Sequence, residues 1–534
     1  MKCDRKFPEC TRCTSSRRSC EGYGVWGGGT PKESGKKLLE RARIFVQPSR
    51  PRKLSFVNLS SGEWETFEWF ERRTIPKLPA AFQSRYWTTL LSQASVSEPA
   101  VLHAILAVGS VHRASVISEG RTNILSASSS SRLTKDGLHH YVEALGQLRT
   151  HTVVRDIGTL RVILTSCIAF ASLELLRGHN ESARGHISHG MRLMQENGWL
   201  SQANEPSSIV TKIPNSTEAW ITDAIKRLYL QMILYETLFL NKVHDDLGWP
   251  ERHIIPPVIR LYTMAWSTLE RLMLQSIWVH NVTKICKSRG VRTECHFSLV
   301  EKQATLKADL DQWYRAYKAG EKLMSKGGDE QRSKDFTEIE INYSLALLLC
   351  ETALASEEEM GSHAITKLFA EPLRLVSRLW HELMLLEGIT RLWEPIGFCH
   401  SILDVGALHA MFFVAVHCRE PQLKLRAIAF LKLLRHRESF WDGHIVSAVA
   451  SRIVGSEVGI TSEALSKARC DDPLPQDKDM ITTGECIQRL EDVTVVAHGE
   501  PAETVEVCHT VKGPDRVEVM KLGEYHVPSR KWTE

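Results

Sequence analysis

The chain has 534 residues, of which 43% are hydrophobic and 24% charged, a composition typical of folded globular proteins. Its longest apolar runs, such as residues 343–350 and 411–416, are far shorter than the roughly 20 residues of a membrane-spanning helix, so we expect no membrane association. The first residues, Met1 to Asp4, are polar and unlike a secretion signal, which predicts an intracellular protein with reduced thiols.

Positive charge is concentrated in the N-terminal part of the chain. Residues 1–53 contain 14 Lys or Arg and five Asp or Glu, a net charge of +9, whereas the whole chain carries +4. A basic arm on a mildly acidic body is typical of a nucleic-acid-binding region joined to a regulatory domain. Charge alone also fits a solvated tail, but a second feature of the same region favours nucleic-acid binding.

That feature is a cluster of four cysteines within the first 20 residues. Cys3, Cys10, Cys13 and Cys20 are separated by six, two and six residues, whereas the whole chain holds only 13 cysteines. Thiolates at such spacings can converge on a tetrahedral zinc ion. The residues around them are basic and comprise Lys2, Arg5, Lys6, Arg12, Arg17 and Arg18.

This N-terminal module resembles the DNA-binding domain of the fungal zinc binuclear-cluster transcription factors. The four cysteines fall on the last four of the six in that family, Pro8 stands where the family has a loop proline, and the Cys20-Glu21-Gly22-Tyr23 ending is typical. The first two cysteines of the family have no counterpart here. The short helix that enters the DNA major groove in that family has no counterpart either, except for its remnant Lys2.

The resemblance implies a zinc site that is incomplete as written. By analogy, Cys10, Cys13 and Cys20 supply three ligands to one ion, and the other keeps only Cys3 and the shared Cys10. Two explanations of the missing cysteines compete: the start of the chain has been placed too far downstream, or the chain has a true half-cluster. Alternatively, the four cysteines hold a single zinc, or they are unliganded thiols in a tail. We expect one ion or none in this chain.

The resemblance also implies a nuclear, sequence-specific regulator of RNA polymerase II genes that binds CGG-type triplets. The six basic residues named above would then contact phosphates or base edges. Residues 23–62 have the composition of a basic flexible linker. Two basic clusters in this linker resemble a bipartite nuclear-import signal: Lys36 and Lys37, then Arg50, Arg52 and Lys53. The linker has no sustained heptad, so it gives no support for dimerisation through a coiled coil.

Residues 63–460 predict one large, all-helical domain, and the fold class is mainly α. Ser97-Glu98-Pro99 is a helix start, and the nearly continuous apolar run over 160–176 predicts a buried helix. A helix over 182–196 is expected to stop at Gly198. Further helices are expected at about 220–241, 257–287, 298–320, 337–357, 362–388, 401–418, 421–436 and 441–457. Polar interruptions are expected at 126–131, 204–216 and 326–334.

This region resembles the fungus-specific regulatory domain that accompanies zinc clusters. The matching segments include Ser97-Glu98-Pro99, Leu175-Leu176-Arg177-Gly178-His179 and, late in the chain, Phe440-Trp441-Asp442. The resemblance implies that the domain modulates activity, through a coactivator or a small-molecule effector. Residues 461–534 contain alternating β-branched segments and predict a small antiparallel β appendage.

Several histidine and cysteine groupings invite an enzymatic interpretation, and none matches a known catalytic spacing. His186 and His189, with His179 nearby, lack the glutamate and the spacing of zinc peptidases and are expected on a solvated helix face. The group Cys399, His400, His409, His417 and Cys418 predicts packed side chains, and His244-Asp245-Asp246 predicts a loop or cap. Gly35-Lys36 follows a glycine-rich run but fails the phosphate-loop pattern.

The sequence therefore predicts a non-enzymatic transcription regulator of the zinc-cluster type. The alternative is a regulator or interaction module that lacks specific DNA binding and acts through its helical domain.

Overall fold

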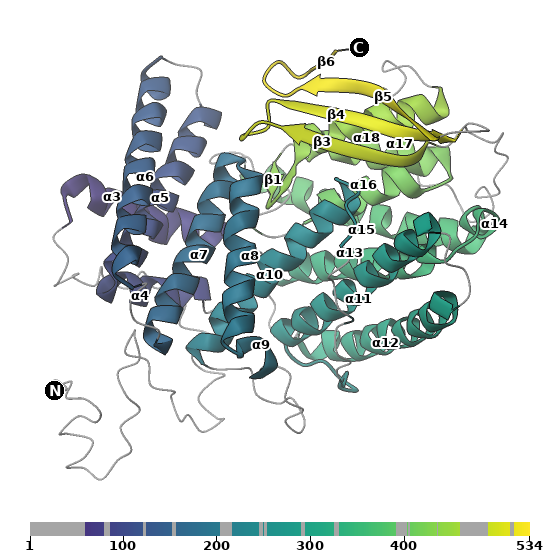
Figure 1. Cartoon of the computed structure of the whole chain (residues 1–534), viewed down its shortest axis with the longest axis horizontal. Coiled ribbons are helices and arrows are strands. Elements are labelled where there is room, and N and C mark those ends of the chain that lie inside the picture. Colours follow the sequence, from purple (N-terminus) through teal and green to yellow (C-terminus); the bar gives the residue numbers. More distant parts are fainter. Residues whose placement is uncertain are drawn as a thin grey trace, which may run out of the picture.

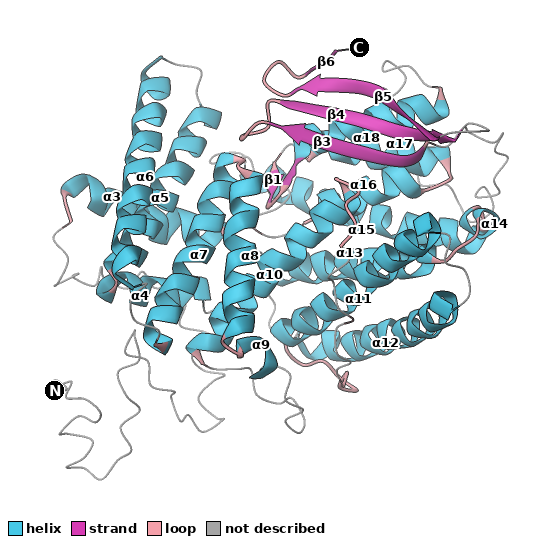
Figure 2. Ribbon diagram, viewed as in Figure 1, coloured by secondary structure: helices cyan, strands magenta, loops and turns pink. Residues whose placement is uncertain are grey.

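The computed structural model is mainly α-helical with a small β-sheet near the C-terminus, as the sequence predicts (Figures 1 and 2). The structure describes residues 59–78, 86–120, 124–151, 156–202, 216–244, 249, 254–289, 294–324, 330–390, 403, 406–434, 436–459, 490–512 and 517–533. All statements about structure below refer to these residues.

The first group of helices occupies the left half of Figure 1. These elements are α3 (Ser61–Trp69), the π-helical η1 (Phe70–Thr74), the 3-10 turn η2 (Ile75–Lys77), the π-helical η3 (Tyr86–Leu90), α4 (Leu91–Ser97), α5 (Pro99–Gly120), α6 (Ile124–His151), α7 (Ile157–Arg177), α8 (Asn180–Glu196), α9 (Trp199–Gln202) and α10 (Thr217–Leu238). A capping box starts α3, since Ser60 accepts from the Glu63 amide while the Glu63 carboxylate accepts from the Ser60 amide.

The second group occupies the right half of the molecule (Figure 1). It comprises α11 (Tyr262–Arg289), α12 (Glu294–Met324), α13 (Glu330–Ala353), α14 (Glu357–Met360), α15 (His363–Thr390), α16 (Leu408–His417), α17 (Pro421–Leu433) and α18 (Gly443–Val458). Gly320 allows α12 to approach the segment before α11 closely, because a Cβ atom there would lie 1.6 Å from the carbonyl oxygen of Ile259.

The β structure forms two antiparallel units. A hairpin of β1 (Arg437–Glu438) and β2 (Trp441–Asp442) precedes α18, and the sheet β3 (Glu491–His498), β4 (Thr504–Lys512), β5 (Val517–His526) and β6 (Lys531–Thr533) has its strands in sequence order. The sheet covers α18 (Figure 2), where the Arg452 Nε donates to the Leu522 carbonyl oxygen at 2.8 Å. The prediction of a small antiparallel appendage is thus confirmed.

The helices share one core. Buried apolar side chains form a contiguous cluster that runs from Phe67 in α3 to Tyr525 in β5. Two helices, residues Pro99–Ser118 of α5 and the whole of α7, are long and apolar enough to cross a membrane, yet 72% and 78% of their apolar windows are buried inside the protein. In this structure they are core helices.

Three expectations about helix boundaries were wrong. The serine-rich segment 126–131 is part of α6 rather than a loop, because tertiary packing against α5 outweighs the weak helix propensity of serine; Ser130 Oγ also donates to the Ala114 carbonyl oxygen at 3.0 Å. Residues 330–334 are helical within α13. In the expected helix at 401–418, α16 begins only at Leu408. The segment 204–216 lies outside the described residues apart from Ser216, whose side chain caps α10.

Candidate functional site at the corner between α7 and α8

The residues predicted to bind zinc and DNA, and those of the predicted import signal, lie outside the described part of the chain. These are Cys3, Cys10, Cys13 and Cys20; Lys2, Arg5, Lys6, Arg12, Arg17 and Arg18; and Lys36, Lys37, Arg50, Arg52 and Lys53. The site that can be built from the structure lies in the helical domain. There, two of the segments quoted above for the regulatory-domain resemblance, 175–179 and 440–442, come together.

The corner begins where α7 ends at Gly178. This residue has φ of +79°, a left-handed conformation that glycine adopts without strain, and α8 starts two residues later. Glu174, only 3% exposed, accepts from Arg177 NH1 at 2.9 Å and lies 3.1 Å from His179 Nδ1. The chain thus turns around a buried carboxylate with two basic neighbours.

Burial shifts the pKa values of Glu174 and His179 in opposite directions. Burial raises the pKa of the Glu174 carboxyl, although the positive charge of Arg177 opposes the shift. Burial, together with the nearby Arg177, lowers the pKa of His179. The lowered pKa favours a neutral His179 imidazole at neutral pH.

The hairpin β1–β2 reaches this corner from more than 250 residues away. Arg437 donates through NH1 to the Leu175 carbonyl oxygen at 3.2 Å and through NH2 to Asp442 Oδ2 at 2.7 Å. Asn180 Nδ2 donates to the Phe440 carbonyl oxygen at 3.3 Å. The end of α7 and the start of α8 are both bonded to the same hairpin.

An aromatic cluster lies beneath the hairpin. Tyr235 of α10 contacts Phe440 and Trp441, with ring centroids 5.7 and 5.5 Å apart, and Trp441 also contacts Phe239 and Phe412. Burial raises the pKa of the Tyr235 hydroxyl well above its usual value. Because Trp441 is fully buried, this contact is part of the core.

Glu438, also on the hairpin, explains the late start of α16. Its fully buried carboxylate accepts from the amides of Gly406 and Leu408 at 2.9 and 3.0 Å, from the Ala407 amide at 3.2 Å, and lies 2.8 Å from His436 Nε2. These amides are at the N-terminus of a helix, where a negative charge is stabilised. Burial would raise the pKa of Glu438, but the hydrogen bond and charge of His436 and the helix amides outweigh it and the pKa is lowered.

The histidines near the corner have separate partners. His179 pairs with Glu174, His186 Nε2 lies 3.1 Å from the Tyr141 hydroxyl, and His189 Nδ1 lies 3.0 Å from Arg192 NH2. The expected solvated face holds for His189, whereas His186 is partly buried and its ring packs against Phe170, so that half of the prediction was wrong.

The later groupings are packed side chains where they are described. His409 is buried with Nε2 3.1 Å from Asn342 Oδ1, and the His417 ring stacks on Phe413 at 4.2 Å. Burial raises the pKa of Cys418 to about 12, so its thiol is protonated at neutral pH. Cys399, His400, Asp245, Asp246, Gly35 and Lys36 lie outside the described residues. His244 pairs with Glu236, at 3.5 Å.

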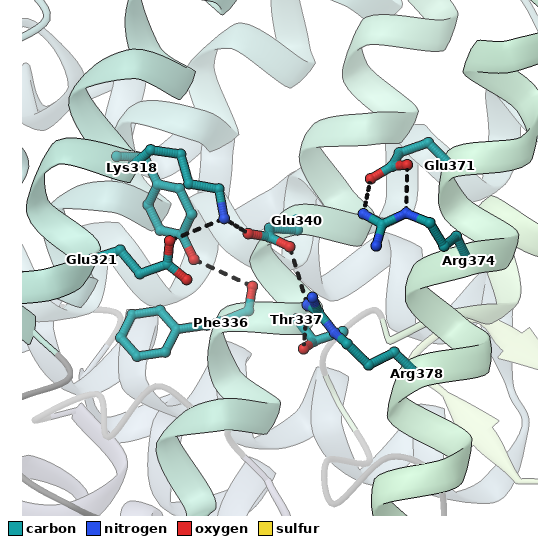
Figure 3. A network of polar contacts seen from close by, with 9 residues as sticks. Lys318, Glu321, Phe336, Thr337, Glu340, Glu371, Arg374 and Arg378 are labelled. Carbon is teal, nitrogen blue, oxygen red and sulfur yellow. Dashed lines mark hydrogen bonds and ion pairs between the residues drawn. The ribbon is translucent and has the colours of Figure 1, made fainter.

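A second polar cluster joins α12, α13 and α15 (Figure 3). Glu340 is 6% exposed and lies between two cations: Lys318 Nζ contacts one oxygen, and Arg378 NH2 lies 3.1 Å from the other. Lys318 also contacts Glu321 at 3.0 Å, and Arg378 donates to Thr337 Oγ1 at 2.9 Å. The buried carboxylate is fully compensated, so this cluster holds three helices together.

The described clusters therefore serve to position helices. Within the described ranges, no group of three or more His, Cys, Asp or Glu side chains is placed to hold a metal ion. The segments that resemble the regulatory domain include Gly178 and Trp441 but not Arg437 or Glu438. The sequence signal that points to Arg437 and Glu438 is their position just before Phe440-Trp441-Asp442.

Comparison with known proteins relates part of the helical domain to transcription regulators. Residues 66–224, which include α4 to α8 and the start of α10, match the family model of the fungal specific transcription factor domain. The chain is 26% identical over 236 residues to the aspercryptin biosynthesis cluster-specific transcription regulator atnN of Emericella nidulans, covering 41% of this chain and 37% of that protein. It is 26% identical over 203 residues to the transcription regulator lscL of Purpureocillium lilacinum, covering 37% of this chain and 46% of that protein.

The chain thus spans less than half the length of each of these curated relatives. No solved structure matches it. The matched segment contains the whole α7–α8 corner.

Proposed function

We propose that this chain, which carries a fungal specific transcription factor domain over residues 66–224, is a nuclear, sequence-specific DNA-binding regulator of RNA polymerase II genes. One observation carries the proposal: the domain follows a basic segment in which four cysteines have zinc-ligand spacing. The two similar proteins are both described as transcription regulators, which also supports a role outside catalysis.

In this proposal Cys3, Cys10, Cys13 and Cys20 hold zinc. Thiolates are preferred ligands of structural zinc, and such sites fold with the metal. The neighbouring lysines and arginines then contact DNA phosphates or base edges, with CGG-type triplets as targets. Lys36, Lys37, Arg50, Arg52 and Lys53 act in nuclear import.

The helical domain has the regulatory role in this scheme. Its described polar clusters are internally paired and bring distant segments together, which suits a domain that relays the binding of a coactivator or small molecule. Arg437, Glu438 and the α7–α8 corner are the junction through which such a signal would pass.

Zinc content of the purified chain tests the module directly. We expect about one zinc ion per chain, lost in Cys13→Ser, because this variant keeps three of the four thiolates that a structural zinc site requires. Cys286→Ser is the matched control, since Cys286 lies in α11, far along the chain from the module. A chain without bound zinc, or equal zinc in both variants, contradicts the proposed module.

The second candidate is a regulator that acts through the helical domain without reading DNA sequence. The family match supports this second candidate in one respect: the match covers residues 66–224 of the helical domain and not the cysteine segment. Sequence preference in DNA binding separates the two candidates.

A further inference from the structure

The first turn of α8 lacks a cap from its own sequence. The first amides of any helix have no acceptor within the helix and need one from elsewhere. At α8 the N-cap residue is His179, which makes no side-chain cap hydrogen bond. Its imidazole is instead engaged with Glu174.

The missing acceptor comes from the C-terminal sheet. Glu500, in the turn between β3 and β4, accepts from the Ser182 amide through Oε1 at 2.6 Å and from Ser182 Oγ through Oε2 at 2.9 Å. The two residues are 318 positions apart in sequence. One end of the sheet accordingly lies beside α8 (Figure 1).

The charges around this contact favour it. The pKa of Glu500 is lowered: partial burial opposes the shift, but the hydrogen bonds that its carboxylate accepts from Ser182 outweigh it. A carboxylate at a helix N-terminus also interacts favourably with the helix dipole.

This contact differs from the other link between the C-terminal part and the corner. The hairpin link runs through part-buried polar bonds of Arg437 and Asn180 above buried Phe440 and Trp441, so it cannot open without unpacking the core. The Glu500–Ser182 bonds are exposed to solvent. Exposed contacts of this kind open at low free-energy cost.

We propose that the β3–β4 turn is a reversible clasp on α8, so that the C-terminal sheet controls the order of the first turn of this helix. When Glu500 is seated, the α8 amides are capped and the corner is held from both sides. When the turn lifts, the Ser182 amide loses its acceptor and the first turn of α8 loosens there, while the hairpin still holds the end of α7 and the side chain of Asn180. Whatever binds the sheet is thereby coupled to the fungal specific transcription factor domain. This inference goes beyond the proposed DNA-binding function and is independent of zinc.

Hydrogen exchange of the full chain, measured at neutral pH by mass spectrometry with single-residue fragmentation, tests the clasp. Glu500→Ala removes the acceptor, and we expect exchange at the Ser182 amide to rise about threefold to tenfold, the effect of losing a helix cap. Glu503→Ala is the control, because Glu503 is an exposed glutamate of the same turn. Exchange within the buried middle of α7 should stay unchanged in both variants.

Two results would overturn the clasp. Unchanged exchange at Ser182 in Glu500→Ala means that the contact does not protect α8 in solution. An equal rise in Glu503→Ala means that general charge loss in the turn, and not the specific hydrogen bonds, affects the helix. Ser182→Ala provides a second measurement, because it removes only the hydroxyl bond and should raise exchange at its own amide less than Glu500→Ala does.

Discussion

At the scale of single residues, buried carboxylates with complete sets of partners hold this domain together. Glu340 lies between Lys318 and Arg378, and Glu438 accepts from three amides near the start of α16. Burying a charge is costly unless it is paired, so the removal of one partner exposes the full penalty. Surface pairs in the same helices carry no such penalty.

Glu340 and Glu371 allow a matched comparison. Glu340→Gln should lower the free energy of unfolding by about 2–4 kcal/mol, because two cations lose their buried counter-charge. Glu371→Gln should cost less than about 1 kcal/mol, since its pair with Arg374 is largely exposed. Chemical denaturation of the two variants measures both values. Equal losses would show that Glu340 is not the buried centre of its cluster.

Glu438 gives a prediction about pH. Its carboxyl pKa is lowered in the folded protein, so its contribution to stability is present at neutral pH and is lost as pH falls through the folded pKa, below the usual 4.5. Glu438→Gln should therefore be less stable by about 2–4 kcal/mol at pH 7. It should also lose less stability than the unmodified chain between about pH 5 and pH 3. Denaturation curves across that range check both statements, with exposed Glu358→Gln as control. Parallel pH profiles for Glu438→Gln and the unmodified chain would contradict the charged state of Glu438.

At the scale of elements, the corner between α7 and α8 depends on a glycine. Gly178→Ala should lower the free energy of unfolding by about 1–2 kcal/mol, because alanine is strained at φ of +79° and its Cβ would lie 2.9 Å from Arg437 NH1. Gly185→Ala in α8 is the control: nothing lies within 4 Å of a Cβ there, and we expect a gain of about 0.5–1 kcal/mol. Thermal or chemical unfolding gives the sign. A neutral Gly178→Ala would show that the corner tolerates another conformation.

The elements also show how far sequence patterns reach. The apolar run of α7 and the start signal of α5 predict those helices well, because burial and local capping act on neighbouring residues. The start of α16 at Leu408 was missed because Glu438, 30 residues later, supplies the acceptors for its amides. The serines of residues 126–131 predict a loop, whereas the structure has this segment within α6, where Ser130 Oγ donates to the Ala114 carbonyl oxygen of α5. Local rules fail where a distant residue sets the boundary.

At the scale of the whole molecule, the sequence predicts the helical class and the β appendage, and the structure confirms both. It does not predict that the appendage and the β1–β2 hairpin meet at one corner of the helical domain. That meeting depends on contacts between residues 260 and 318 positions apart. The hydrophobic periodicity of a sequence predicts single helices and strands and not contacts over such separations. The corner joins the end of α7 and the start of α8 to two distant β elements. In the proposed function, the cysteine module would connect this helical domain to DNA.

Sequence preference in DNA binding is the measurement that tests the central claim most directly. Fluorescence anisotropy of the zinc-loaded chain should be titrated with a duplex that contains CGG triplets and with a shuffled duplex, at rising salt concentrations. We predict at least about tenfold tighter binding to the CGG duplex, with the preference kept as salt weakens both complexes. Equal affinities that disappear together at modest salt would contradict specific readout and favour a regulator that acts through its helical domain.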